Sequence, residues 1–404
     1  MLTLQELEGI AMANNPTLAQ ANAQIQGARG AAFQAGLPFN PVMGYVGEQI
    51  GVNGTAGELQ GGYISQEIVT AGKLRLSRAK YAQRVQIAAT IADAQQQRVL
   101  NDLRTQFYRA LAAQRLVEIQ RRLAANGNDN VQTNREMLNL GQTMASAVLQ
   151  AEVELRRDQL NLMDAENEVQ QNLRTLAALA GVPQLSSTTL EDNLTTLQEP
   201  LDYDSALGQL LNNSPELIAA WQKIRHDEIQ LARERVQPIP NILVDARVGR
   251  NLEAGDTTTG VTIGLPIPFF DRNRGTIQQA QADLCRAQAE ARRLELELQT
   301  RLAAEYRTYL SAWQRLAEYQ ATMLPKAQEA TEMLAQSYKD RRATWIDVLA
   351  AQRLQMALET EYVLSLKTYH ETDIAIRGML LSGGLTEPPA PVGGGHIDAT
   401  PKPR

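Results

Sequence analysis

Two periodicities share this chain, and together they predict long helices interrupted by two β-hairpins. Over 241–265 the period is two. Ile242, Val244, Ala246 and Val248 are apolar, and they alternate with mostly polar neighbours. Segment 40–70 mixes glycine with Val, Ile and Tyr, which predicts the other hairpin. Helical patterns cover about 3–13, 16–36, 73–139, 147–180, 215–237, 275–340 and 345–381. The chain is therefore expected to be mainly α-helical, with one hairpin in each half.

The two longest helical patterns are too long for the core of a compact domain. The first would span roughly 100 Å if continuous, since a helix rises 1.5 Å per residue. Each pattern contains a predicted weak point, at Asn126–Asn130 and at Pro325, where proline should kink the helix. Such helices must bury their apolar stripes against neighbouring helices, as in a coiled coil or a larger tube.

The sequence contains an internal repeat, in which the second half matches the first at a shift of about 200 residues. Pro16 and Pro41 recur as Pro215 and Pro240, and Gln114-Arg115-Leu116 recurs as Gln314-Arg315-Leu316. Proline occurs at the ends of helices rather than in their interiors, so the shared helical composition of the two halves does not explain these matches. We expect a first repeat over 1–200 and a second over 201–381. The Pro/Gly-rich tail 382–404 is expected to be disordered.

Composition narrows the function by exclusion. The 404 residues are 44% hydrophobic and only 5% aromatic, and the net charge of −6 without a long basic run argues against nucleic acid as a partner. No stretch approaches the roughly 18 apolar residues of a transmembrane helix, and the start of the text shows no signal peptide. The single cysteine, Cys285, allows no internal disulfide.

No catalytic constellation or cofactor motif stands out, so an enzyme is not expected. His226-Asp227-Glu228 suggests a metal site, but neighbours in a helix point to different faces, which favours a surface cluster. His396 and Asp398 lie in the tail and suggest a featureless segment more than a weak metal site. No metal and no cofactor are predicted.

The order helix, hairpin, long helix, turn and helix, present twice, resembles the TolC family of outer-membrane efflux proteins. The matching features are the starts at Pro16 and Pro215, the strand-to-helix turns at Gly72 and 271–275, and the helix-turn segments 141–151 and 342–351. Pro-Ile-Pro-Phe-Phe-Asp-Arg-Asn-Arg-Gly, residues 266–275, most resembles the branch that serves heavy-metal cation pumps, of the CzcC type.

The resemblance implies a homotrimer in the outer membrane, extending into the periplasm. Each chain would contribute four strands to a shared twelve-stranded barrel, while the helical hairpins form a periplasmic α-barrel. Closing such a barrel removes open sheet edges, which lipid does not tolerate. Ile242, Val244, Ala246 and Val248 would then face lipid, and Asp245 and Arg247 would face the lumen. The first hairpin is too rich in glycine for its faces to be assigned.

The resemblance also implies that the helix-turn tips form the periplasmic entrance and contact an adaptor protein. The first tip comprises Gly141, Gln142, Thr143, Met144, Ala145 and Ser146, and the second Arg341, Arg342, Ala343 and Thr344, with Asp347 just inside the next helix. Arg341-Arg342 stand where the family usually has glycine, and the first tip lacks an acidic residue opposite Asp347. Asp347 is either a gating or docking carboxylate or a favourable charge in a first helical turn. Arg341-Arg342 either contact an acidic adaptor or form a solvated loop.

The predicted function is a passive trimeric exit duct of a tripartite efflux system. An inner-membrane pump, of the resistance-nodulation-division type, would deliver substrate through the adaptor, and the substrate would be divalent heavy-metal cations. Two alternatives stay open: a type I protein-secretion duct of the same fold, and a soluble or periplasmic structural coiled coil or adaptor. The two alternating hairpins argue against the second alternative, because a rod has no use for them.

Overall fold

The computed structural model describes residues 2–51, 58–184, 190, 194–197 and 199–391. The chain divides into two compact units. One comprises Met1–Ala19, Ala94–Ser214 and Leu296–Glu387, and the other comprises Gln20–Asp93, Pro215–Glu295 and Pro388–Arg404. Across the described ranges, no helix combines the length and apolar character needed to cross a bilayer.

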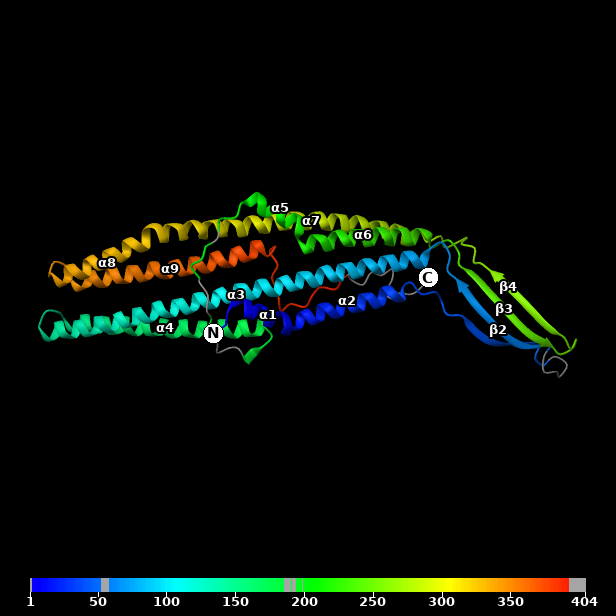
Figure 1. Ribbon diagram of the computed structural model, residues 1–404, viewed down its shortest axis with the longest axis horizontal. Helices are drawn as coiled ribbons and strands as arrows, with labels where there is room; N and C mark the ends of the chain where they lie inside the picture. The colour runs from blue at the N-terminus through cyan, green and yellow to red at the C-terminus, as the bar shows by residue number, and fades with distance from the viewer. Residues whose placement is uncertain (1, 52–57, 185–189, 191–193, 198, 392–404) are drawn as a thin grey trace. The chain divides into compact units, whose positions relative to one another are not determined.

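The first unit is built from helical hairpins. Helix α3 (Lys73–Asn139) contributes its second half and lies beside α4 (Ala145–Leu179), and α8 (Leu324–Lys339) lies beside α9 (Trp345–Arg377), as Figure 1 shows. The unit also holds α1 (Leu4–Asn14), α5 (Tyr203–Asn213) and the end of α7 (Arg274–Glu318). A core cluster joins α1, α3 and α4 through Leu7, Leu103, Phe107 and Leu176, each almost fully buried. The unit is thus held by helix packing, as the small and aliphatic composition predicts.

The second unit carries one four-stranded antiparallel sheet in the order β1-β2-β3-β4. The strands are β1 (Val42–Glu48), β2 (Leu59–Ile68), β3 (Ile242–Asn251) and β4 (Thr257–Gly264), and they are accompanied by most of α2 (Pro16–Gln34) and by α6 (Pro215–Val236) (Figure 1). Both predicted hairpins are present. The sequence did not predict that β2 and β3 pair along their whole length, from Leu59 opposite Asn251 to Ile68 opposite Ile242. This pairing joins the two halves of the chain in one sheet.

The two predicted weak points in the long helices behave differently. Asn126–Asn130 lie inside the unbroken α3, so the helix predicted over 73–139 is present and this weak point does not interrupt it. Asn130 is buried and accepts from the Trp345 indole N–H at 3.0 Å, which gives a polar side chain a stabilising partner inside the helix. At Pro325 the helix does change, because a π-turn (Tyr319–Met323) separates α7 from α8. A π-turn re-routes the hydrogen bonds that a proline ring disrupts.

The beginning of the C-terminal tail is ordered, contrary to the prediction of disorder from residue 382 onward. The Asp102 carboxylate accepts from the backbone N–H groups of Gly383 and Gly384 at 3.0 and 2.7 Å. Thr17 Oγ1 donates to the carbonyl of Gly384 at 2.9 Å. Glycine and proline content was a poor guide here, because the half-buried Asp102 carboxylate fixes the backbone. Residues 392–404, with His396 and Asp398, lie outside the described residues.

Candidate functional site

The sheet has one apolar and one polar face, and the strand register shows on which face each side chain of the two hairpins lies. Val244 pairs with Gln66 and Ile263, and Ala246 pairs with Ile64 and Val261, so these side chains share one face. Directly paired residues point to the same side of a sheet, and successive residues alternate. The same face carries Met43, Tyr45, Ile68, Ile242 and Val248. Met43, Val261 and Ile263 each expose about two thirds or more of their surface.

The first hairpin, whose faces the sequence left unassigned, therefore places Met43, Tyr45, Ile64 and Ile68 beside the predicted lipid-facing residues of the second. On the opposite face, Gly44 allows close packing. A side chain at Gly44 would collide with the ring of Tyr63, because an added Cβ would lie 2.6 Å from Tyr63 Cε1. Glycine here makes room for an aromatic neighbour, which hides the period of two in the sequence.

The opposite face is polar. Arg247 donates to Glu48 at 2.8 Å across the sheet, and both side chains are about half exposed. Asp245 is flanked across the strands by Ser65 on β2 and Thr262 on β4. Asp245 and Arg247, predicted to face water, thus lie on the polar face, while Ile242, Val244, Ala246 and Val248 lie on the apolar one.

Both helix-turn tips end their first helix with the same backbone motif. At the first tip the Gln142 N–H donates to the Met137 carbonyl at 2.8 Å, and at the second the Arg342 N–H donates to the Ser337 carbonyl at 2.8 Å. These six-to-one bonds mark Schellman endings, which need one residue in the left-handed region. That residue is Gly141 (φ 69°) in the first tip and Arg341 (φ 59°) in the second. Gln142, Ser146, Arg341 and Arg342 are exposed, and Thr143 is half-buried.

Left-handed backbone is free of steric cost for glycine but costs other L-residues roughly 1–2 kcal/mol. The second tip therefore keeps an arginine at a position where its own backbone is strained. Arg342 also approaches Asp340 at 3.5 Å, while remaining 78% exposed. Both guanidinium groups are available to a partner outside this chain.

Asp347 begins α9 as part of a capping box with Thr344. The Asp347 carboxylate accepts from the Thr344 backbone N–H at 2.9 Å and from Thr344 Oγ1 at 2.6 Å, and the Asp347 N–H donates back to Thr344 Oγ1 at 3.3 Å. The hydrogen bonds from the Thr344 side chain and then its backbone lower the pKa of Asp347. Of the two interpretations of Asp347, this geometry supports the first-turn helix charge.

The two helical hairpins of the first unit are cross-linked near their tips. Arg353 on α9 pairs with Glu154 on α4 at 2.6 Å, and Asn126 on α3 donates to Gln352 at 3.3 Å. Arg122 and Glu359 form a further ion pair. These contacts join tip-bearing hairpins that lie in different halves of the sequence, and sequence patterns alone did not indicate them.

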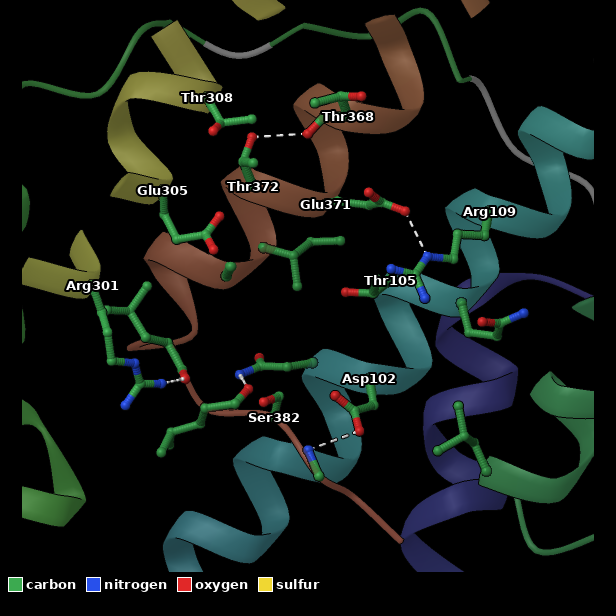
Figure 2. Close-up of a pocket in the computed structure, with 18 of the residues that line it drawn as sticks. Asp102, Thr105, Arg109, Arg301, Glu305, Thr308, Thr368, Glu371, Thr372 and Ser382 are labelled. Atoms are coloured by element: carbon green, nitrogen blue, oxygen red, sulfur yellow. Dashed lines mark hydrogen bonds and ion pairs between the residues drawn. The ribbon is translucent and has the colours of Figure 1, made fainter. Parts of the chain in front are cut away.

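A cavity of about 920 Å³, lined by both polar and apolar side chains, lies among α3, α7, α9 and the ordered tail (Figure 2). Arg109 donates to Glu371 at 2.5 Å, and Arg301 donates to the Leu380 carbonyl at 2.6 Å. Thr308 and Thr372 donate their hydroxyl hydrogens to carbonyls of their own helices, at 3.2 and 2.8 Å. The cavity walls thus mix polar and apolar groups, and several of the polar groups bond within the protein, which suits water more than a tightly recognised ligand.

Asp227 is buried, and of the predicted surface cluster only Glu228 is exposed. His226 is not a surface residue either, so the prediction is wrong for both buried members. His226 is buried between α6 and α3, where Arg84 Nε donates to its Nε2 at 3.2 Å and its Nδ1 lies 2.8 Å from Asp227 Oδ1. Burial lowers the pKa of His226, opposed by the hydrogen bond to Asp227 and assisted by Arg84 and Lys80. Arg84 donates to a neutral imidazole, so these contacts describe a structural histidine. Within the described ranges, no three His, Cys, Asp or Glu residues gather as metal ligands.

Comparison with known proteins gives a consistent result. A family model described as "Outer membrane efflux protein" matches residues 8–182 and again residues 206–380, which confirms the internal duplication. The cobalt-zinc-cadmium resistance protein CzcC of Cupriavidus metallidurans is 25% identical over 369 residues, spanning 90% of this chain and 86% of that protein. The nickel-cobalt-cadmium resistance protein NccC of Alcaligenes xylosoxydans is 26% identical over 294 residues, spanning 72% of this chain and 66% of that protein.

Among solved structures, the outer-membrane channel OprN superposes with a TM-score of 0.78 at 18% identity, covering 95% of this chain and 91% of that one. CusC superposes with a TM-score of 0.70 at 16% identity, covering 94% and 92%. The predicted mainly helical, duplicated fold of a TolC-like channel is therefore confirmed. These relatives are channel and resistance proteins rather than enzymes.

Proposed function

Because this chain belongs to the outer membrane efflux protein family, we propose that it is the exit duct through which divalent heavy-metal cations leave the cell. Members of this family work as trimeric outer-membrane channels with adaptor and inner-membrane pump partners. The match to the cobalt-zinc-cadmium resistance protein over 90% of this chain supports the metal substrate. Its pump would be of the resistance-nodulation-division type and would supply the energy, so the duct itself needs no catalytic group.

A trimer is supported by the edges of the sheet. The outer edges of β1 and β4 pair with no other strand among the described residues, and the edges belong to different strands. Unequal edges associate head to tail, which closes a ring when the rotation allows it. Four strands are too few to close a barrel alone, whereas three chains supply the twelve that the family resemblance implies. In that barrel the apolar face, with Val244 and Val261, would face lipid, and Asp245 and Arg247 would face the lumen.

The tips are proposed to dock the adaptor, chiefly through Arg341 and Arg342. Support comes from the retained backbone strain at Arg341, because strain persists where a side chain serves a role that glycine cannot. The exposed residues Gly141, Gln142, Ser146 and Thr344 and the half-buried Thr143 complete this surface. Asp347 would act indirectly, by fixing the start of α9.

The docking role is tested by replacing both arginines with glutamate. Arg341→Glu/Arg342→Glu should weaken adaptor crosslinking while the trimer still assembles. A matched control is Arg286→Glu, an equally exposed arginine on α7 (70% exposed). Normal crosslinking and normal efflux in the double variant would remove the docking role without touching the duct.

The substrate is tested in cells that lack this gene. Deletion should increase sensitivity to cobalt, zinc, cadmium or nickel, and the intact gene should restore tolerance. Unchanged metal tolerance together with increased sensitivity to organic drugs would reject the metal substrate and leave the duct intact.

A further inference from the structure

The segment that leaves the sheet after β4, Leu265–Phe270, is unusually apolar and unusually exposed. Phe270 is 103% exposed, Phe269 70% and Ile267 65%. Loops that face water normally carry polar turn residues, and contiguous exposed apolar groups mark an interaction site. This segment therefore has a partner that accepts apolar side chains.

Three of the six residues in this segment present no free backbone N–H. Pro266 and Pro268 have no N–H, and the Phe269 N–H donates to the Ile267 carbonyl at 2.9 Å. A loop in water gains nothing from such an arrangement. In contact with lipid each missing or satisfied donor lowers the cost, because hydrocarbon offers no hydrogen-bond acceptor.

The position of the segment agrees with a lipid surface. It continues directly from β4, whose Val261 and Ile263 lie on the exposed apolar face of the sheet, at the end where the chain returns to α7 (Figure 1). Exposed charged residues follow at once: Asp271, Arg272 and Arg274. The apolar surface therefore ends abruptly at a charged boundary.

The corresponding segment of the first half has a different character. After β2, Thr70 Oγ1 donates to the Pro240 carbonyl at 2.6 Å, and Lys73 Nζ donates to the Ile239 carbonyl at 2.5 Å and to Asn241 Oδ1 at 2.8 Å. That segment is fastened to its own protein. The exposed apolar segment is thus a specific feature of the second half.

We infer that Leu265–Phe270 is a membrane-interface anchor, seated in the periplasmic leaflet of the outer membrane with Phe269 and Phe270 at the boundary between acyl chains and headgroups. The inference rests on the proposed lipid-facing side of the sheet. Aromatic side chains favour this boundary, and the charges that follow would lie among headgroups and water. The anchor would fix the depth at which the strands end and the helices begin.

Site-directed spin labelling of the full-length trimer in phospholipid vesicles tests the anchor. In a Cys285→Ser background, which removes the native cysteine, nitroxides are placed singly by Ile267→Cys and Phe270→Cys. Ile263→Cys on the apolar face of β4 is the lipid control, and Met333→Cys, 64% exposed on α8, is the water control. Collision with oxygen reports lipid, and collision with a water-soluble nickel chelate reports water.

The anchor requires that labels at 267 and 270 collide several-fold more with oxygen, relative to nickel, than the label at 333. Strong nickel collision at 270 with oxygen collision at 263 would overturn the anchor while keeping the membrane sheet. Nickel collision at 263 as well would overturn the lipid-facing side itself. An immobile label at 270 that meets neither reagent would show that a second copy of the chain covers the segment, which also overturns the anchor.

Discussion

Replacing Arg341 with glycine separates the structural cost of this residue from its proposed function. Arg341 adopts a left-handed backbone (φ 59°), where Gly141 stands in the equivalent turn. Removing the side chain relieves roughly 1–2 kcal/mol of steric cost. Glycine also has more conformational freedom in the unfolded chain, which stabilises the unfolded state by roughly 0.5–1 kcal/mol and opposes the relief of steric cost. With both terms taken near the middle of their ranges, the net stabilisation of the turn is about 0.5–1 kcal/mol.

Amide hydrogen exchange at the turn measures this change locally. The N–H of residue 342 donates to the Ser337 carbonyl and exchanges when the turn opens. A stabilisation of about 0.5–1 kcal/mol slows that exchange by roughly two- to fivefold. Arg341→Gln is the matched control, because it removes the charge but keeps the strain. It should leave exchange unchanged and weaken adaptor binding as much as Arg341→Gly does.

The reverse change is the second arm of the experiment. Gly141→Ala introduces a Cβ at φ 69°, so exchange at the Gln142 N–H should accelerate by a similar factor. Equal or faster exchange in Arg341→Gly would refute the strain argument. Unchanged adaptor binding in both Arg341 variants would instead show that the arginine is kept for a reason other than docking.

Three further predictions follow from buried contacts. Because burial lowers the pKa of His226 below its ordinary 6.5, its contribution to stability is complete above that pH and is lost as the pH falls through 6.5; His226→Gln should flatten this part of the curve of melting temperature against pH. Asp102→Ala leaves two backbone N–H groups without their charged acceptor, costs about 1.5–3 kcal/mol locally, and should speed exchange and proteolysis at 383–386. Gly61→Ala places Cβ 2.1 Å from the Val248 carbonyl oxygen and should reduce trimer yield, whereas Gly62→Ala, whose nearest contact is 3.6 Å, should not.

Local patterns in the sequence predicted the helices and hairpins well, because each depends on residues close in the chain. As expected, α2 begins at Pro16, α9 begins directly after Thr344, and the alternation over 241–249 forms a strand. The pairing of β2 with β3 depends on residues far apart, and no local signal encodes it. The faces of the first hairpin were hidden because Gly44 accommodates Tyr63 and interrupts the alternation.

The remaining misses share one physical cause, which is that residues distant in the sequence supply hydrogen-bond partners to polar groups. Asn126–Asn130 look like a weak point in a helix, yet Trp345 and Gln352 supply partners to this stretch. The predicted disorder from 382 onward fails because Asp102 binds its backbone. His226 was expected on the surface because three successive residues of a helix point to different faces, but Arg84 and Asp227 satisfy it inside the protein. The presence of a polar residue in the sequence does not show whether a residue far away in the chain will form a hydrogen bond with it.

The fusion of two similar halves through β2 and β3 has an evolutionary consequence. Six separate copies of one half would form a ring in which every turn is identical, and any substitution would appear six times. Fusion makes neighbouring halves heritable as a pair, so a trimer presents two kinds of turn in alternation. Gly141 and Arg341, which occupy the same backbone conformation, have already diverged in this way. One turn can thus be selected for backbone ease and the other for the chemistry of its side chain.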